Sequence, residues 1–217
     1  MDALYNLATG PLLMFSFLVF VLGCAARVVF FVRLARSKDL PVFQGFKPQW
    51  AARSIVHWLL PANITAKASP FVTGFGFLFH IPLLACALFC QAHVVLVDQA
   101  WGLSWWSMPD EITDLLALIF FAAAAFFAAR RLLAPEVKIL TTAADWLALA
   151  VAVAPMLTGF LAYRQIGDYN LMITLHVLSG NLLLLAIPFT KLSHMILFFV
   201  SRAVTGSDFG KRQVGAW

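Results

Sequence analysis

The sequence contains few charged residues. Only 12% of its 217 residues are charged, whereas 62% are hydrophobic, and the mean hydropathy is +0.89. An ordinary soluble domain has about 25% charged and 45–50% apolar residues. So few charges cannot cover a water-facing surface around a chain of this length, which excludes a soluble enzyme and indicates a protein that folds in a lipid bilayer.

Cysteine is also scarce. Cys24, Cys86 and Cys90 all lie inside apolar runs, and none belongs to a C-x-x-C pair. This excludes a disulfide framework, an iron–sulfur motif and a covalent haem-attachment motif, so we expect packing roles for all three. The N-terminus carries Asp2 and no Lys or Arg before its apolar run. A cleavable signal peptide begins with basic residues, so we expect this run to remain as a helix.

Apolar runs of about 20 residues, the length that crosses a bilayer as a helix, occur five times. We therefore predict an all-α membrane protein, a single bundle of five transmembrane helices over residues 1–217. In the connection after the first run, apolar residues recur at helical spacing, which predicts an amphipathic helix at 50–60 on the inner membrane surface. The same segment would also suit docking of a cytoplasmic partner. The five predicted helices cover residues 11–32, 71–97, 112–129, 145–163 and 170–200.

The basic residues predict the orientation. Twelve Lys and Arg residues fall in the first connection, the third connection and the tail, whereas the opposite side carries only Arg164. Lys and Arg accumulate on the cytoplasmic side, so we expect a periplasmic N-terminus and a cytoplasmic C-terminus in a bacterial inner membrane. Trp101, Trp105 and Trp106 would then form an outer aromatic belt. The twelve are Arg33, Arg36, Lys38, Lys47, Arg53, Lys67, Arg130, Arg131, Lys138, Arg202, Lys211 and Arg212.

Four of the five histidines lie in the predicted spans, where ionisable residues are costly and indicate function. His176 and His194 are separated by about five turns of one helix, so they would share a face about 27 Å apart. His80 and His93, on the second helix, would lie about 20 Å apart along the axis. Because the two helices run antiparallel, His93 falls level with His176, and His80 with His194.

Two histidine pairs at two depths fit axial ligation of two haem groups. Zinc would need its ligands converged at one point, and a proton relay would want carboxylates, which the spans lack near these histidines. His80 and His93 would face different sides, about 220° apart, unless Pro82 distorts the helix between them. The structural alternative is that each histidine hydrogen-bonds across to another helix.

Three further residues lie close to these histidines in sequence or depth. Lys191 and Arg27 are placed to reach haem propionates, although each would also suit simple snorkelling to the inner surface. Gly180, one turn after His176, would let a porphyrin approach the helix backbone, or would serve helix–helix packing.

Several segments together resemble a known family. Residues 176–194 (HVLSGNLLLLAIPFTKLSH), residues 130–145 and residues 79–81 resemble the gamma subunit of respiratory nitrate reductase, a five-helix dihaem cytochrome b. Residues 9–11, 101–106 and 206–210 resemble the membrane cytochrome b subunits of the Tmc and Hmc complexes of sulfate-reducing bacteria. The resemblance covers most of the chain.

The resemblance implies two haem b groups. It assigns His80 and His194 to the haem nearer the cytoplasm, and His93 and His176 to the haem nearer the periplasm. The nitrate reductase subunit spaces its second-helix ligands ten residues apart, a spacing that falls on Cys90 here, so His93 departs from the pattern. The resemblance also implies electron transfer between a periplasmic multihaem cytochrome c, or menaquinone, and a cytoplasmic iron–sulfur subunit of the heterodisulfide-reductase type.

Other functions remain open at the level of sequence. Asp98 and Gln99, just after His93, would hydrogen-bond a quinone, or would simply begin a solvated loop. A haem-free membrane anchor for peripheral subunits is one alternative to the electron-transfer subunit. A histidine-based proton or metal transporter is another, and the lack of buried acids and of interrupted helices argues against it.

Overall fold

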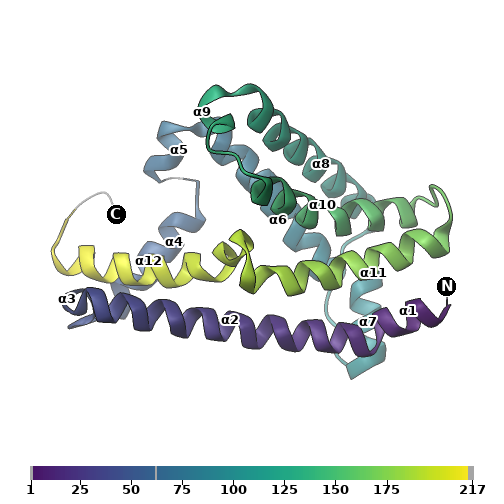
Figure 1. The fold of residues 1–217 in the computed structure, drawn as a ribbon, viewed down its shortest axis with the longest axis horizontal. Coiled ribbons are helices and arrows are strands. Elements are labelled where there is room, and N and C mark those ends of the chain that lie inside the picture. Colours follow the sequence, from purple (N-terminus) through teal and green to yellow (C-terminus); the bar gives the residue numbers. More distant parts are fainter. Residues whose placement is uncertain (1, 62, 215–217) are drawn as a thin grey trace. The chain divides into compact units, whose positions relative to one another are not determined.

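The computed structural model describes residues 2–61 and 63–214 of the chain. It divides into two compact units, one made of residues 1–70 and 177–217 and the other of residues 71–176. Among the described residues, five helices are long and apolar enough to cross a membrane, so the predicted multi-pass helical membrane protein is confirmed. These helices are α2 (Pro11–Lys38), α6 (Pro70–Phe89), α8 (Asp110–Leu133), α10 (Ala143–Tyr163) and α11 (Tyr169–Ala186), as Figure 1 shows.

Shorter helices fill the connections. A short N-terminal helix precedes α2, and α4 occupies the segment predicted to form an amphipathic helix. The shorter helices are α1 (Asp2–Thr9), α3 (Leu40–Phe43), α4 (Pro48–Leu59), α5 (Ile64–Ala68), α7 (Gln91–Trp101), α9 (Pro135–Lys138) and α12 (His194–Lys211).

Two of the predicted spans are interrupted. The helix predicted at 71–97 breaks at Cys90, whose backbone is extended (ψ 132°), so α6 ends at Phe89 and α7 begins at Gln91. Pro82 stays inside α6, so the break lies beyond the proline where we expected a distortion.

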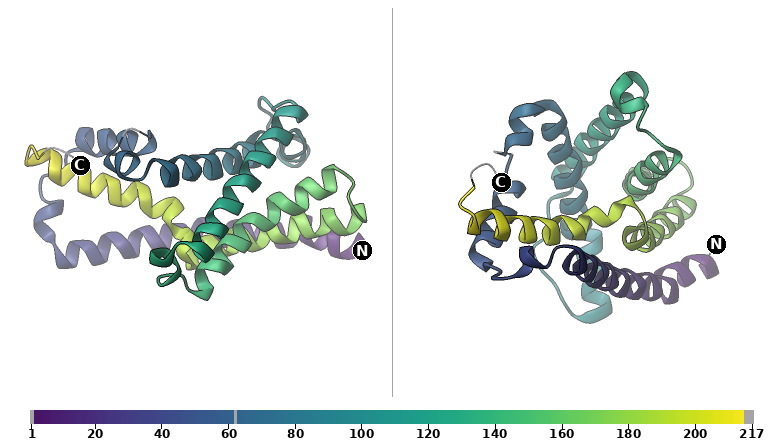
Figure 2. Two further views of the ribbon diagram at one scale, coloured as in Figure 1. Left: turned by 90° about the horizontal axis from the view of Figure 1, so that it is seen from above. Right: turned by 60° about the vertical axis from the view of Figure 1, so that its left-hand side comes forward.

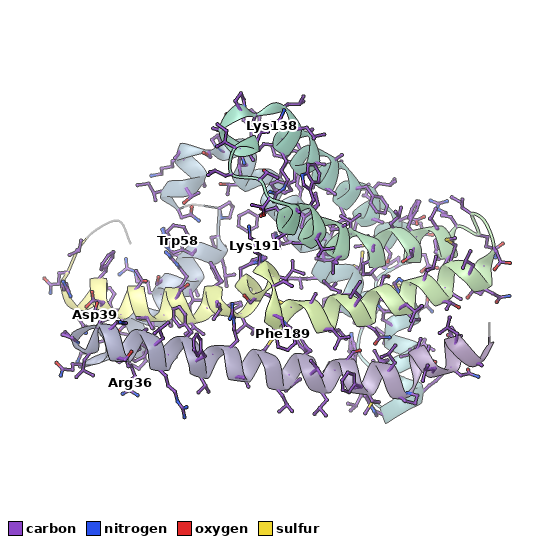
Figure 3. All side chains as sticks on the ribbon, in the orientation of Figure 1. Arg36, Asp39, Trp58, Lys138, Phe189 and Lys191 are labelled. Atoms are coloured by element: carbon purple, nitrogen blue, oxygen red, sulfur yellow. The ribbon has the colours of Figure 1, made fainter. Side chains whose placement is uncertain are left out.

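The helix predicted at 170–200 is interrupted as well. It passes through the 3-10 turns η1 (Ile187–Phe189) and η2 (Lys191–Ser193), between which Thr190 is extended (φ −119°, ψ −173°). The argument that His176 and His194 share one face of a continuous helix is therefore wrong. Figure 3 labels Phe189 and Lys191 on either side of this break.

Aromatic and alanine side chains form the core of the unit at residues 71–176. Phe79 of α6 packs on Phe120 of α8, with ring centroids 4.5 Å apart, and Phe120 is fully buried. Ala123 and Ala124 of α8 and Ala152 of α10 complete the buried cluster. Small residues at these positions let helices approach closely, which is how helices pack when lipid supplies no hydrophobic driving force.

Charged residues close the ends of α8 and α10. Asp145 accepts from the backbone N–H of Thr142 at 2.9 Å, which caps the start of α10, and it lies 3.8 Å from Arg131 at the end of α8. At the other end of these helices Arg164 pairs with Asp114. The two ion pairs tie α8 to α10 at both ends, where the side chains leave the apolar region.

In the other unit, α2 packs along η1 and α12 (Figure 1). A Cβ on Gly23 would lie 2.8 Å from the ring of Pro188, so α2 can approach η1 this closely only with glycine at that position. Towards the N-terminus, the buried Asn181 side chain donates to the Ala8 carbonyl at 3.0 Å.

The closest packing in this unit joins α4 to α12, which lie side by side (Figures 1 and 2). A Cβ on Gly206 would lie 2.2 Å from Ser54 Cβ, and a Cβ on Gly210 would lie 2.3 Å from the Trp50 ring. Two glycines four residues apart share one face of a helix, so α12 presents a flat surface to α4. The hydroxyl of Ser207 accepts from the backbone N–H of Lys47 at 2.8 Å.

This packing predicts that Gly206→Ala separates α4 from α12. The added methyl group overlaps Ser54 Cβ and the Trp50 carbonyl, neither of which is a flexible side-chain end. Overpacking of this kind costs about 1–3 kcal/mol. We expect faster tryptic cleavage after Arg53 of α4 in the detergent-solubilised protein. The matched control is Gly180→Ala, whose Cβ meets no described atom within 4 Å. Equal cleavage rates in the two variants would contradict the packing.

Candidate functional site

The site is centred on His93 of α7 and His176 of α11, which both lie in the unit at residues 71–176. Their Nε2 atoms are 3.5 Å apart, their ring centroids are 5.8 Å apart, and their ring planes differ by 7°. The centroid separation exceeds the nitrogen separation by about twice the centre-to-nitrogen distance of an imidazole. The rings therefore meet end to end in nearly parallel planes, with each Nε2 pointing at the other.

Backbone carbonyls determine the tautomer of both histidines. His176 Nδ1 lies 2.8 Å from the carbonyl oxygen of Pro155, and His93 Nδ1 lies 3.1 Å from that of Ala87 and 3.2 Å from that of Cys86. A carbonyl oxygen can only accept, so in each ring Nδ1 carries the proton and donates. The neutral imidazoles consequently direct an Nε2 lone pair toward each other.

α10 supports the His176 ring. Pro155 supplies the acceptor, and Gly159, one turn later on the same face, leaves room for the imidazole. A Cβ on Gly159 would lie 2.8 Å from His176 Nδ1 and 2.9 Å from Cε1. α10 therefore holds the ring by one hydrogen bond and by direct contact with its backbone.

Within the described residues, two histidines and no larger cluster of metal-ligating side chains make up this site. Among residues 2–61 and 63–214, no three His, Cys, Asp or Glu side chains converge as a metal-ion site would require. Tetrahedral zinc sites use three or four protein ligands. Two opposed imidazoles instead match the pair of axial ligands that a planar macrocycle leaves to the protein.

His80 lies on α6 in the same unit. Its Nδ1 is 2.8 Å from the carbonyl oxygen of Gly76, one turn earlier, which assigns the proton to Nδ1 here too. Its ring meets that of Phe79 edge on, with centroids 5.4 Å apart. Since Phe79 packs into the buried cluster with Phe120, the position of His80 on α6 is fixed by the core.

His194 lies in the other unit, at the first position of α12. Its Nδ1 is 2.8 Å from the carbonyl oxygen of Lys191, so it adopts the same tautomer as the other three. Lys191, expected only to offer its ammonium group, thus also supplies a backbone acceptor. Arg27 lies one turn after Gly23 on α2, on the face that contacts Pro188, and is exposed like Lys191.

The remaining predicted residues are placed as follows. Gly180 lies on α11, and a Cβ added there would meet no described atom within 4 Å. Asp98 and Gln99 are exposed residues of α7, the helix that also carries His93. The solvated loop that they were alternatively expected to begin starts only after Trp101.

Sequence reasoning missed the residues that orient the histidines. Pro155 and Gly159 stand four residues apart in the fourth apolar run, and a proline followed by a glycine one turn later was the available signal. The break at Cys90 had no such signal, because neither proline nor glycine occurs at positions 90 or 91.

Gly159→Ala should displace His176 and destabilise the protein by about 1–3 kcal/mol, because the new methyl group overlaps a ring that Pro155 holds in place. We expect a lower midpoint of thermal denaturation in detergent, followed by circular dichroism. Gly74→Ala on α6 is the control, since its Cβ meets no described atom within 4 Å and alanine favours a helix. If Gly159→Ala were as stable as this control, the described contact would be wrong.

The chain is similar to a curated protein along nearly its whole length. No protein-family model matches the chain, and no solved structure matches it. A protein of Nitratidesulfovibrio vulgaris strain Hildenborough, described only as "Protein", is 38% identical over 220 residues, which cover 98% of this chain and 96% of the relative. Identity at this level along the whole length shows common descent, and this chain belongs to the same family as the Nitratidesulfovibrio vulgaris protein.

Proposed function

We propose that this chain is a dihaem cytochrome b subunit that carries electrons across a membrane. The observation that carries the proposal is the end-to-end pair of His93 and His176, in which both rings donate through Nδ1 and direct Nε2 inward. Two lone pairs facing each other at 3.5 Å repel unless a cation lies between them. An iron ion held by two axial imidazoles meets that requirement.

His93 and His176 would hold the haem iron through Nε2 atoms that lie 3.5 Å apart in this structure. Their ring planes differ by only 7°, and each Nδ1–H group is bonded to a backbone carbonyl, so both rings present Nε2 for ligation.

For the second haem we propose His80 and His194 as ligands. Each donates through Nδ1 to a backbone carbonyl of its own segment, so each has the tautomer that ligates through Nε2. Arg27 and Lys191, in the same unit as His194, are the cations proposed to hold its propionates. Gly180, where an added Cβ would meet no described atom within 4 Å, is proposed to leave room for a porphyrin against α11.

Haem b, when bound, supplies a reversible one-electron couple. The residues of this chain fix its axial ligands, keep both imidazoles in one tautomer and surround them with apolar helices. A hydrogen bond from Nδ1–H to a carbonyl raises the basicity of the ligating nitrogen, which is a recognised means of tuning a metal centre. We propose no substrate pocket, because electron transfer requires none.

The charge pattern supports the orientation within this proposal. Twelve Lys and Arg residues lie in the connections and tail assigned to the cytoplasm, against Arg164 on the other side. We propose that the N-terminus is periplasmic, that the membrane is a bacterial inner membrane, and that the partners are a cytoplasmic iron–sulfur subunit and a periplasmic multihaem cytochrome c. The resemblance to Tmc and Hmc subunits and to the nitrate reductase gamma subunit supports these partners.

Menaquinone is a further proposed redox partner, beside the outer haem. Asp98 and Gln99 are exposed on the helix that carries His93 and offer a carboxylate and an amide to a quinone carbonyl or hydroxyl. Their place on the same helix as a proposed ligand is what supports this part of the proposal.

Two other functions compete with this one. A haem-free anchor would be colourless. One structural observation favours a histidine-based transporter. The helices are interrupted at Cys90 and Thr190, so the absence of interrupted helices no longer argues against this function. The lack of carboxylates beside the histidines still argues against it.

The test is the haem content of purified variants, measured by the pyridine haemochrome assay and by redox-titrated visible spectra. We expect two haem b groups with separate midpoints in the wild-type protein. His176→Ala should lose the outer haem alone, and His194→Ala the inner haem alone. The control is His57→Ala, an exposed position on α4 outside the spans, which should keep both. A haem-free wild-type protein, or two haems retained in His176→Ala, would refute the assignment.

A further inference from the structure

The break between α6 and α7 leaves backbone carbonyl groups without their helical hydrogen-bond donors. When a helix ends, the carbonyls of its last turn lose their intrahelical partners, and buried carbonyls without partners are costly. At the end of α6 these are the carbonyls of Ala87, Leu88 and Phe89, which precede extended Cys90, whereas the carbonyl of Cys86 keeps its bond from the backbone N–H of Cys90 at 3.2 Å. Each of these three accepts a hydrogen bond from a group outside α6.

Two different groups supply these bonds. The His93 ring donates to the Ala87 carbonyl at 3.1 Å and also lies 3.2 Å from the carbonyl of Cys86. The loop after α7 accounts for the other two. The indole N–H of Trp105 donates to Leu88 at 2.7 Å, and the backbone N–H of Met108 donates to Phe89 at 2.8 Å.

The geometry of His93 depends on the loop at 102–109. If α6 continued without a break, the backbone N–H groups of residues 92 and 93 would take the carbonyls of Leu88 and Phe89. In the structure Trp105 and Met108 donate to these carbonyls instead, and the chain turns at Cys90 before α7 begins. His93 then lies three residues into α7, with its ring directed back to α6.

We propose that Trp105 is a positioning residue for His93, holding the helix break that aims the imidazole at His176. The inference rests on the proposed function where it concerns a haem ligand. Trp105 belongs to the run expected to form an aromatic belt at the membrane surface, and this specific role is distinct from that general one. Met108 acts through its backbone, so Trp105 is the member of the loop that substitution can test.

The experiment compares Trp105→Phe with Trp106→Phe. Phenylalanine removes the indole donor and keeps an aromatic ring. Trp106 is the matched control because it lies next in the same loop, is 65% exposed, and contacts Phe89 through its ring. Both variants remove one indole from the outer surface, so any difference reports the bond to Leu88 and not the loss of a belt residue.

Two readouts are used. The first is the rate at which a small maleimide labels Cys90, located by mass spectrometry, since Cys90 is partly exposed at the break whereas Cys24 and Cys86 are buried. We expect Trp105→Phe to label about fivefold faster, the change in a local opening equilibrium when one ordinary hydrogen bond is lost. The second is the electron paramagnetic resonance signal of the outer haem, which reports the angle between its two imidazole planes. It should change in Trp105→Phe while the inner signal stays constant.

The outcomes separate the two proposals. Faster labelling of Cys90 and an altered outer signal in Trp105→Phe only would support the positioning role. Equal labelling and equal outer signals in the two variants of a haem-loaded protein would overturn this inference and leave the proposed function standing. A wild-type protein without haem would overturn the proposed function instead.

Discussion

A helix that stops among apolar surroundings leaves carbonyl groups that water does not readily reach, and this constraint organises the two irregular points of the fold. At the end of α6 the acceptors are satisfied by the His93 ring and by the loop at 102–109. Near the end of α11, the His194 ring donates to the carbonyl of Lys191 beside the second break. The same side chains that we assign to haem ligation therefore also satisfy the backbone where it departs from a helix.

Because these histidines also bond to backbone carbonyls, their rings are held rigidly. A histidine that bonds only to another flexible side chain can rotate with it, whereas His176 is held by a main-chain oxygen at Pro155 and by the backbone of Gly159. Each of the four histidines that we assign to haem ligation has a backbone acceptor of this kind, at Gly76, Ala87, Pro155 and Lys191. The backbone therefore fixes the orientation of each imidazole ring, and a small change in ring angle requires a movement of the backbone.

The sequence allowed the spans to be predicted, because runs of apolar residues long enough to cross a bilayer have few other uses. It also allowed His93 to be matched with His176, since counting residues along antiparallel helices needs only the helical rise. The breaks were not predictable in the same way. Pro188 is a local sequence signal for the break near Thr190. No such signal accompanies the break at Cys90, where the hydrogen bonds from Trp105 and Met108 come from a loop that follows in the chain.

The pairing of α4 with α12 joins segments from opposite ends of the sequence, since the hydrogen bond from Lys47 to Ser207 spans 160 residues. The surface that Ser54 and Trp50 present to α12 is therefore uncovered during synthesis until α12 leaves the ribosome. Docking of α4 is thus a late event, because it requires a helix that is made long after α4 itself.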